Sequence, residues 1–273
     1  MSVAGRISCR NFVDWNGYAY FSNWFYNGMF KVEIGTGNTT FLGHFEGDKL
    51  FEINIHKEIF RLDNKIFFCP RRGGNVHIYD LFEETMSSIS IRKNNEKFFI
   101  IENAILEGGA IYLIPRQKEF SVRKLDLTSL KLTKENKTFD IQDLRLSENK
   151  MILSNPELIK KYHIKNANCF SWNQIGSKTW YGFLSMGSQL LKYTEERNEI
   201  EKIPLTVINE TILENYLYKV REDILKMKLV SDYMLDLRDY FECVKIKESS
   251  NYNNCKNIDS VGKRIWVGNY RRR

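Results

Sequence analysis

The sequence has few of the residues that build metal-bound, disulfide-stapled or disordered chains. Its 273 residues include four histidines, five cysteines and only four prolines. No histidines or cysteines have the spacing of metal ligands, and the cysteine count is odd. We therefore expect no metal site and reduced thiols. Few prolines and 16 glycines argue against a long linker or low-complexity segment.

Signatures of cofactors, secretion and membrane insertion are also missing. The sequence contains no glycine-rich phosphate loop, nucleophile elbow or zinc motif, so we expect no cofactor and favour a protein that is not an enzyme. No stretch is long enough to span a membrane, and no charged-then-apolar signal segment follows Met1. Together with reduced cysteines, these absences predict a cytoplasmic protein. Each histidine is expected to have a structural or surface role.

Aromatic residues are abundant, and they favour strands. Phe, Tyr and Trp make up 14% of the chain, and apolar residues make up 42%. The segment from Lys57 to Ile91 predicts four short strands in a row, separated by turn-forming residues such as Asp63-Asn64. This pattern is typical of an antiparallel meander. One such sheet becomes stable only when copies of it pack together.

Copies of this segment are present. The stretch from Gly108 to Pro115 repeats the stretch from Asp63 to Pro70, and the two prolines are 45 residues apart. A further copy begins at Trp15. A period in the forties with four strands per unit is typical of a β-propeller blade. The alternative is a run of β-hairpins in another all-β fold.

The repeated strands resemble a known type of blade. An Ile-Tyr/Phe-x-Ile/Cys-Pro strand, followed by a strand ending in Tyr-Asp or Leu-Asp, resembles the blades of uncharacterised bacterial β-propeller repeat proteins. It is distantly similar to kelch and WD repeats. The segment from Gly262 to Trp266 resembles the end of the same bacterial proteins. The chain does not repeat the Gly-His and Trp-Asp pairs of WD repeats, and it lacks paired glycines in every blade, unlike kelch repeats. The resemblance implies a fold and no reaction.

The predicted fold is therefore mainly β. Residues 1–205 form a propeller-like array of about four to five four-stranded antiparallel blades, in which 139–167 is an insertion or a decayed blade. Residues 206–273 form a C-terminal helical segment with a basic tail, because Leu213, Leu217 and Val220 follow a period near 3.6. These helices either cap the propeller or form a dimerising arm, which would give a homodimer.

The candidate site lies in loops of the predicted propeller. The loops between second and third strands share one face with the loops between blades, and two of the former are basic while one is aromatic. Arginine recognises carboxylates and phosphates, and Trp and Tyr offer flat surfaces to sugar rings or bases. The predicted ligand-binding residues are Arg71, Arg72, Arg116, Lys118, Trp24 and Tyr26. The alternative is that the basic residues are only solvated and that Trp24 packs on a neighbouring blade.

Three functions follow from these features. The favoured hypothesis is a non-catalytic binding or scaffold protein, whose partner is a protein or an acidic glycan. The second is a carbohydrate-active enzyme, a glycosidase or lyase, which would need paired carboxylates that the sequence does not show. The third is a weak, sequence-independent nucleic-acid contact through Arg271–Arg273. Five positive charges of the net +7 lie in the last eleven residues, so nucleic acid is not the expected partner.

Overall fold

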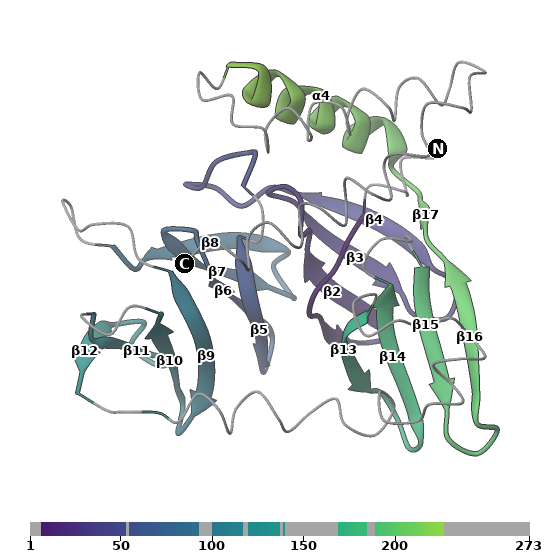
Figure 1. Ribbon diagram of the computed structural model, residues 1–273, viewed down its shortest axis with the longest axis horizontal. Helices are drawn as coiled ribbons and strands as arrows, with labels where there is room; N and C mark the ends of the chain where they lie inside the picture. Colours follow the sequence, from purple (N-terminus) through teal and green to yellow (C-terminus); the bar gives the residue numbers. More distant parts are fainter. Residues whose placement is uncertain are drawn as a thin grey trace, which may run out of the picture. The chain divides into compact units, whose positions relative to one another are not determined.

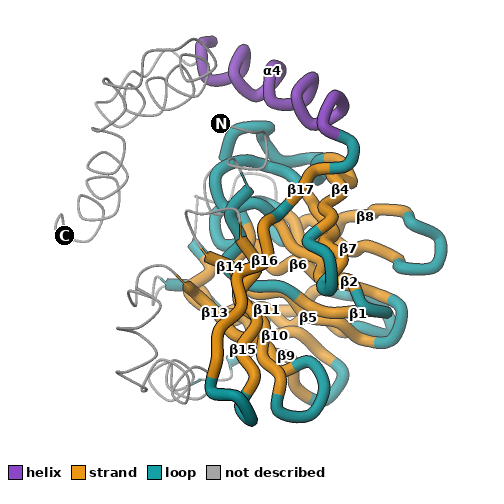
Figure 2. Tube along the Cα trace, turned by 90° about the vertical axis from the view of Figure 1, so that its right-hand side faces the viewer, coloured by secondary structure: helices purple, strands orange, loops and turns teal. Residues whose placement is uncertain are grey.

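A computed structural model describes residues 7–52, 55–92, 100–116, 120–136, 139, 169–184 and 189–226. The described chain is mainly β, as predicted, and contains four antiparallel sheets that each have four consecutive strands. Figures 1 and 2 show these sheets from two directions. The interval 139–167, apart from Phe139, lies outside the described residues. So do Lys118, any helix after Lys226 and the basic tail.

Each sheet is a meander of neighbouring strands. The first contains β1 (Val13–Trp15), β2 (Tyr18–Ser22), β3 (Met29–Glu33) and β4 (Asn38–Gly43). The second contains β5 (His56–Leu62), β6 (Lys65–Pro70), β7 (Asn75–Asp80) and β8 (Thr85–Ser90). The third contains β9 (Ile101–Glu107), β10 (Ala110–Pro115), β11 (Val122–Asp126) and β12 (Leu132–Glu135). The fourth contains β13 (Cys169–Gln174), β14 (Thr179–Leu184), β15 (Gln189–Thr194) and β16 (Glu199–Pro204).

Repeated aspartates close the turns between third and fourth strands. Asp80 Oδ1 accepts hydrogen bonds from the backbone N–H groups of Phe82 and Glu83. Asp126 Oδ1 accepts equivalent bonds from Thr128 and Ser129. These bonds are the first cause of the lowered pKa of each aspartate. Each aspartate therefore caps a turn at an equivalent place in its repeat.

The sheets pack face to face through apolar side chains, in the propeller-like order third, second, first, fourth (Figure 1). A buried cluster joins the second and third sheets and includes Phe67, Ile78, Ile111 and Leu113. The Phe45 ring, just after β4, lies 4.8 Å from that of Phe68 in the second sheet. On the other side of the first sheet, Phe183 of β14 contacts Phe12 and Phe21, with ring centroids 5.2 and 4.8 Å apart. The fourth sheet therefore packs against the first.

A two-residue strand, β17 (Thr206–Val207), links the end of the repeat to its beginning. It pairs in parallel with β4, and the Thr206 N–H donates to the Gly37 carbonyl oxygen over 3.0 Å. The Asn209 side chain then bonds both the N–H and the carbonyl of Phe41. The helical segment predicted from residue 206 thus begins with a strand. The chain returns from the fourth sheet to the outer edge of the first.

Helix α4 follows from Glu210 to Lys226. Its predicted apolar stripe is buried at Leu213, Leu217 and Val220, whereas Ile212 and Tyr218 are exposed. This spacing of buried residues is that of an amphipathic helix. Within the described ranges, no helix has the length and apolar character that crossing a membrane requires.

Candidate functional site

One end of the sheets carries the predicted basic loops, and we call it the site face. Strand register places them there. His56 at the start of β5 pairs with Pro70 at the end of β6, and Ile101 pairs with Pro115 in the third sheet. The residues that follow these prolines, Arg71 and Arg116, therefore leave their sheets at equivalent ends. The connection between the first and second sheets, residues 44–55, ends on this face as well.

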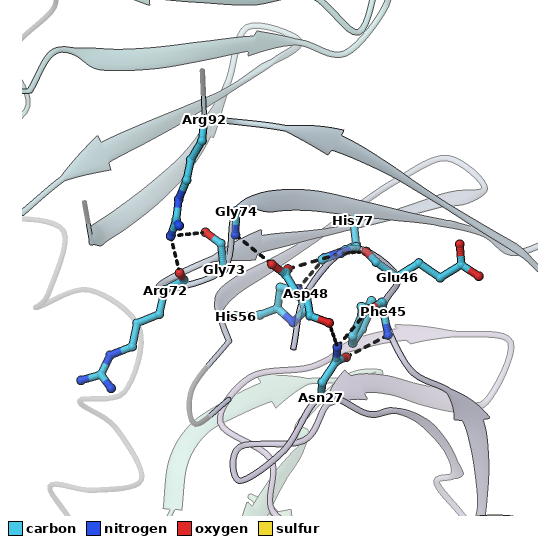
Figure 3. Close-up of polar contacts among 10 residues, drawn as sticks. All are labelled: Asn27, Phe45, Glu46, Asp48, His56, Arg72, Gly73, Gly74, His77 and Arg92. Carbon is cyan, nitrogen blue, oxygen red and sulfur yellow. Dashed lines mark hydrogen bonds and ion pairs between the residues drawn. The ribbon is translucent and has the colours of Figure 1, made fainter. Parts of the chain in front are cut away.

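The loop from Arg71 to Gly74 is held in place by several hydrogen bonds (Figure 3). The Gly74 N–H donates to Asp48 Oδ1 over 3.0 Å, and the Arg92 guanidinium donates to the Arg72 carbonyl over 2.6 Å. The Arg71 N–H donates to the Ile55 carbonyl. The Arg72 side chain extends away from these contacts in Figure 3. The loop backbone is thus fixed while an arginine side chain projects from it.

Gly73 is required by the close approach of Asp48. A Cβ atom on Gly73 would lie 2.8 Å from Asp48 Oδ2, which is too close for a real contact. The connection that carries Asp48 is fixed in turn by Asn27, whose side chain bonds both the N–H and the carbonyl of Phe45 at 2.8 Å (Figure 3). The Asn27 N–H donates to Leu50. The glycine and the aspartate therefore act together to position the loop.

A buried histidine pair lies beneath this loop. The His77 Nε2–H donates to the Glu46 carbonyl over 3.1 Å, so His77 Nδ1 accepts the Nε2–H of His56 over 2.9 Å (Figure 3). Burial lowers the pKa of both rings, and His77 lowers that of His56 further. Asp48 Oδ2, 3.5 Å from His77 Nε2, acts in the opposite direction on the pKa of His77. Both rings have the predicted structural role, but their contact across β6 was not predicted.

We call the first strand of each sheet its inner strand. The inner strands β5 and β9 carry β-bulges near the site face. Between the pairs His56–Pro70 and Glu58–Cys69, one residue of β5, Lys57, has no partner in β6. In β9 the corresponding residue is Glu102, between Asn103, which pairs with Ile114, and Ile101. Lys57 and Glu102 are 45 residues apart, which is the repeat period. Bulges occur often next to functional sites, where they redirect a side chain.

The first sheet has a similar irregularity before β1. Cys9 pairs with Asn23 and Val13 with Tyr20, so residues 10–12 face only two residues of the partner segment. In β13 the register also shifts between Cys169 and Trp172. The irregularity therefore recurs at the same end of all four inner strands.

Charged groups from three sheets gather around Lys57. Its pKa is lowered to about 8, chiefly by burial; Glu102 and Glu58 oppose this shift, and Arg10 and Arg71 add to it. Glu58 accepts a hydrogen bond from the Asn11 side chain over 3.0 Å. The Nε of Arg116 lies 3.9 Å from a carboxylate oxygen of Glu102. We call this group the axial cluster: Arg10, Asn11, Lys57, Glu58, Arg71, Glu102 and Arg116.

The predicted site residues have different positions. Arg71 and Arg116 belong to the axial cluster, and Arg72 extends from the loop beside it. Trp24 is half-buried, and the Arg10 guanidinium lies 5.2 Å from the centre of its ring. Tyr26 is only 1% exposed and its ring contacts Phe30, so it is a core residue rather than a stacking surface. Lys118 lies outside the described residues.

Comparison with known proteins gives distant structural neighbours. No protein-family model matches the chain, and no curated protein matches it. A streptogramin B lyase is 14% identical over 72% of this chain, with a TM-score of 0.34. A virginiamycin B lyase from Staphylococcus aureus is 11% identical over 72%, with a TM-score of 0.36. The extracellular domain of BT4673 from B. thetaiotaomicron is 15% identical over 76%, with a TM-score of 0.33. The chain spans 55%, 56% and 23% of these three proteins.

Proposed function

We propose that the protein is a non-catalytic binding protein whose site face takes an acidic segment of a partner protein. The observation that carries this proposal is the excess of positive charge. Arg10, Lys57, Arg71 and Arg116 supply four cations to the axial cluster, whereas Glu58 and Glu102 supply two carboxylates. Arg72 adds a fifth cation on the adjoining loop, where the carboxylate of Glu52 partly offsets its charge. An acidic ligand offsets the mutual repulsion of these cations.

The fixed loop backbone supports this proposal. Ordering a mobile loop on binding lowers affinity, because the loop loses conformational freedom. Here the bonds from Asp48 and Arg92 hold the Arg71–Gly74 backbone before any ligand arrives. Binding then has to order only the arginine side chains.

The aromatic residues favour a protein segment over an acidic glycan. Sugar rings usually stack on exposed aromatic faces. Tyr26 is in the core, and Trp24 is half-buried with Arg10 over its ring. The flat surface that a glycan would use is therefore much reduced, whereas arginine side chains remain at the surface: that of Arg116 is 62% exposed.

The proposal is tested by titrating the protein with a capped hexaglutamate peptide and, separately, with an oligogalacturonate of similar charge. We expect the peptide to bind, and its affinity to fall steeply as salt concentration rises. Arg71→Ala with Arg72→Ala should weaken binding at least roughly tenfold. Lys65→Gln is the matched control, because Lys65 begins β6 at the opposite end of the same sheet.

The outcomes separate the competing functions. Binding of the oligogalacturonate without the peptide would contradict the proposal and favour an acidic glycan as the ligand. New reducing ends in that sample would favour a carbohydrate-active enzyme. Equal binding by the double variant and the Lys65→Gln control would show that the loop arginines are not the site.

A further inference from the structure

Lys57 differs from the other cations of the site face. It is a bulge residue of an inner strand and is half-buried. Within the part of the chain that the structure describes, no hydrogen bond or ion pair reaches its ammonium group. The two carboxylates that act on Lys57 have other contacts, since Glu58 accepts a hydrogen bond from Asn11 and Glu102 lies 3.9 Å from Arg116. A half-buried ammonium group whose neighbouring carboxylates have other contacts is available to an anion from outside the chain.

We propose that Lys57 is the centre of an anion subsite that takes one carboxylate of the bound ligand. The inference rests on the proposed function and names the chemistry of its deepest contact. Glu102 and Glu58 act on Lys57 more strongly than Arg10 and Arg71 do, but with Lys57 and Arg116 the axial cluster holds four cations against two carboxylates. An ammonium group is a compact point charge, which suits a single carboxylate oxygen better than a planar, bidentate contact.

The subsite and the exposed Arg116 should contribute differently to binding. Exposed charges mainly change the association rate and its salt dependence, whereas a desolvated charge pair mainly changes the dissociation rate. Arg116 is exposed, so it attracts the acidic segment. The charge of Lys57 is partly desolvated, so Lys57 holds one carboxylate of that segment once it has docked.

Lys57 also gives the subsite a pH signature that arginine cannot give. Arginine stays charged throughout the accessible pH range, whereas Lys57 has a pKa of about 8. A bound carboxylate favours the charged ammonium and so raises this pKa in the complex. Affinity is therefore close to its full value at pH 7 and falls as the pH rises through 8. With one proton required for binding, the loss between pH 7 and pH 9 is roughly tenfold.

The experiment measures capped hexaglutamate binding at pH 7 and pH 9 with three variants. Lys57→Gln should bind at least roughly tenfold more weakly at pH 7 and lose the pH dependence. Lys57→Arg should keep most of the affinity at pH 7 and also lose the pH dependence, because its charge does not titrate. Lys65→Gln is again the matched control and should behave as the unmodified chain. A hexaglutamate with a free C-terminal carboxylate, compared with the capped peptide, shows which type of carboxylate enters the subsite.

A second measurement examines Lys57 without any peptide. The rate at which an amine-reactive ester modifies Lys57 is followed by mass spectrometry at pH 8, with acetate replacing chloride at constant ionic strength. We expect acetate to slow modification of Lys57 and to leave Lys65 unaffected. Protection by acetate without hexaglutamate binding would support the subsite and contradict the proposed acidic segment. Hexaglutamate binding that is unchanged in Lys57→Gln would overturn the subsite and leave the proposed function standing. If hexaglutamate does not bind and acetate does not protect Lys57, both the subsite and the proposed function are overturned.

Discussion

The junction of β17 with the first sheet can be tested with two glycine substitutions. Gly37 has a φ of +78°, and a Cβ atom on it would overlap the carbonyl oxygen of Pro204. Gly17 has a nearly equal φ of +80°, but a Cβ atom there would meet nothing within 4 Å. Gly17→Ala therefore introduces backbone strain alone. Gly37→Ala introduces the same strain and also pushes Pro204 away from the first sheet.

The expected costs follow from this difference. A non-glycine residue in the left-handed region costs about 1–2 kcal/mol of unfolding free energy. Displacing Pro204 also strains the bond from the Thr206 N–H to the Gly37 carbonyl and its neighbour from Ile208 to Thr39. Each such bond contributes about 1 kcal/mol. We therefore expect Gly37→Ala to cost about 2 kcal/mol more than Gly17→Ala.

The assay is equilibrium unfolding in urea, followed by tryptophan fluorescence. Both variants should keep the unfolding slope of the unmodified chain. The urea midpoint of Gly17→Ala should lie below that of the unmodified chain, and the midpoint of Gly37→Ala should be lower still. Equal midpoints for the two variants would refute the reasoning, because the contact between Gly37 and Pro204 would then contribute nothing. A Gly17→Ala variant less stable than Gly37→Ala would have the same meaning.

Two further predictions concern buried titratable groups. Since the pKa values of His56 and His77 are lowered in the fold, the unfolded chain binds more protons below the ordinary histidine pKa of about 6.5. The free energy of unfolding, measured in urea titrations, should therefore be highest above that pH and fall at lower pH. Asp48→Asn should steepen the fall, because it removes the charge that favours protonated His77. A free energy of unfolding that stays constant down to pH 5 would contradict this. Cys9 and Cys69 are free and buried, and burial raises the pKa of the Cys69 thiol. A thiol reagent should modify them slowly in the native protein and label all five cysteines in the denatured, unreduced protein, whereas fewer than five would reveal a disulfide.

The sequence was most informative where the repeat determines structure locally. The 45-residue spacing of Pro70 and Pro115 predicted equivalent strands, and both prolines end second strands. Asp80 and Asp126 stand 46 residues apart, close to the repeat period, and both cap turns. Turn chemistry and strand alternation act over a few residues, so they can be read without knowing the tertiary contacts.

The missed features depend on register and long-range packing. Lys57 and Glu102 stand at the repeat spacing, but only the pairing with neighbouring strands shows that they are bulge residues. His56 and His77 meet across an intervening strand. Tyr26 lies in a loop, where no alternation indicates whether a ring points inward. The pairing of β17 with β4 joins residues more than 160 positions apart.

The pairing of β17 with β4 also has a consequence for biosynthesis. A ribosome produces the first sheet long before it produces Thr206, so the outer edge of β4 stays without its partner until nearly the whole repeat has been made. Exposed strand edges pair readily with other chains. A nascent or prematurely terminated chain that stops before Thr206 would carry such an edge. Synthesis through Val207, rather than the completion of the first sheet, is thus the step that covers the edge of β4.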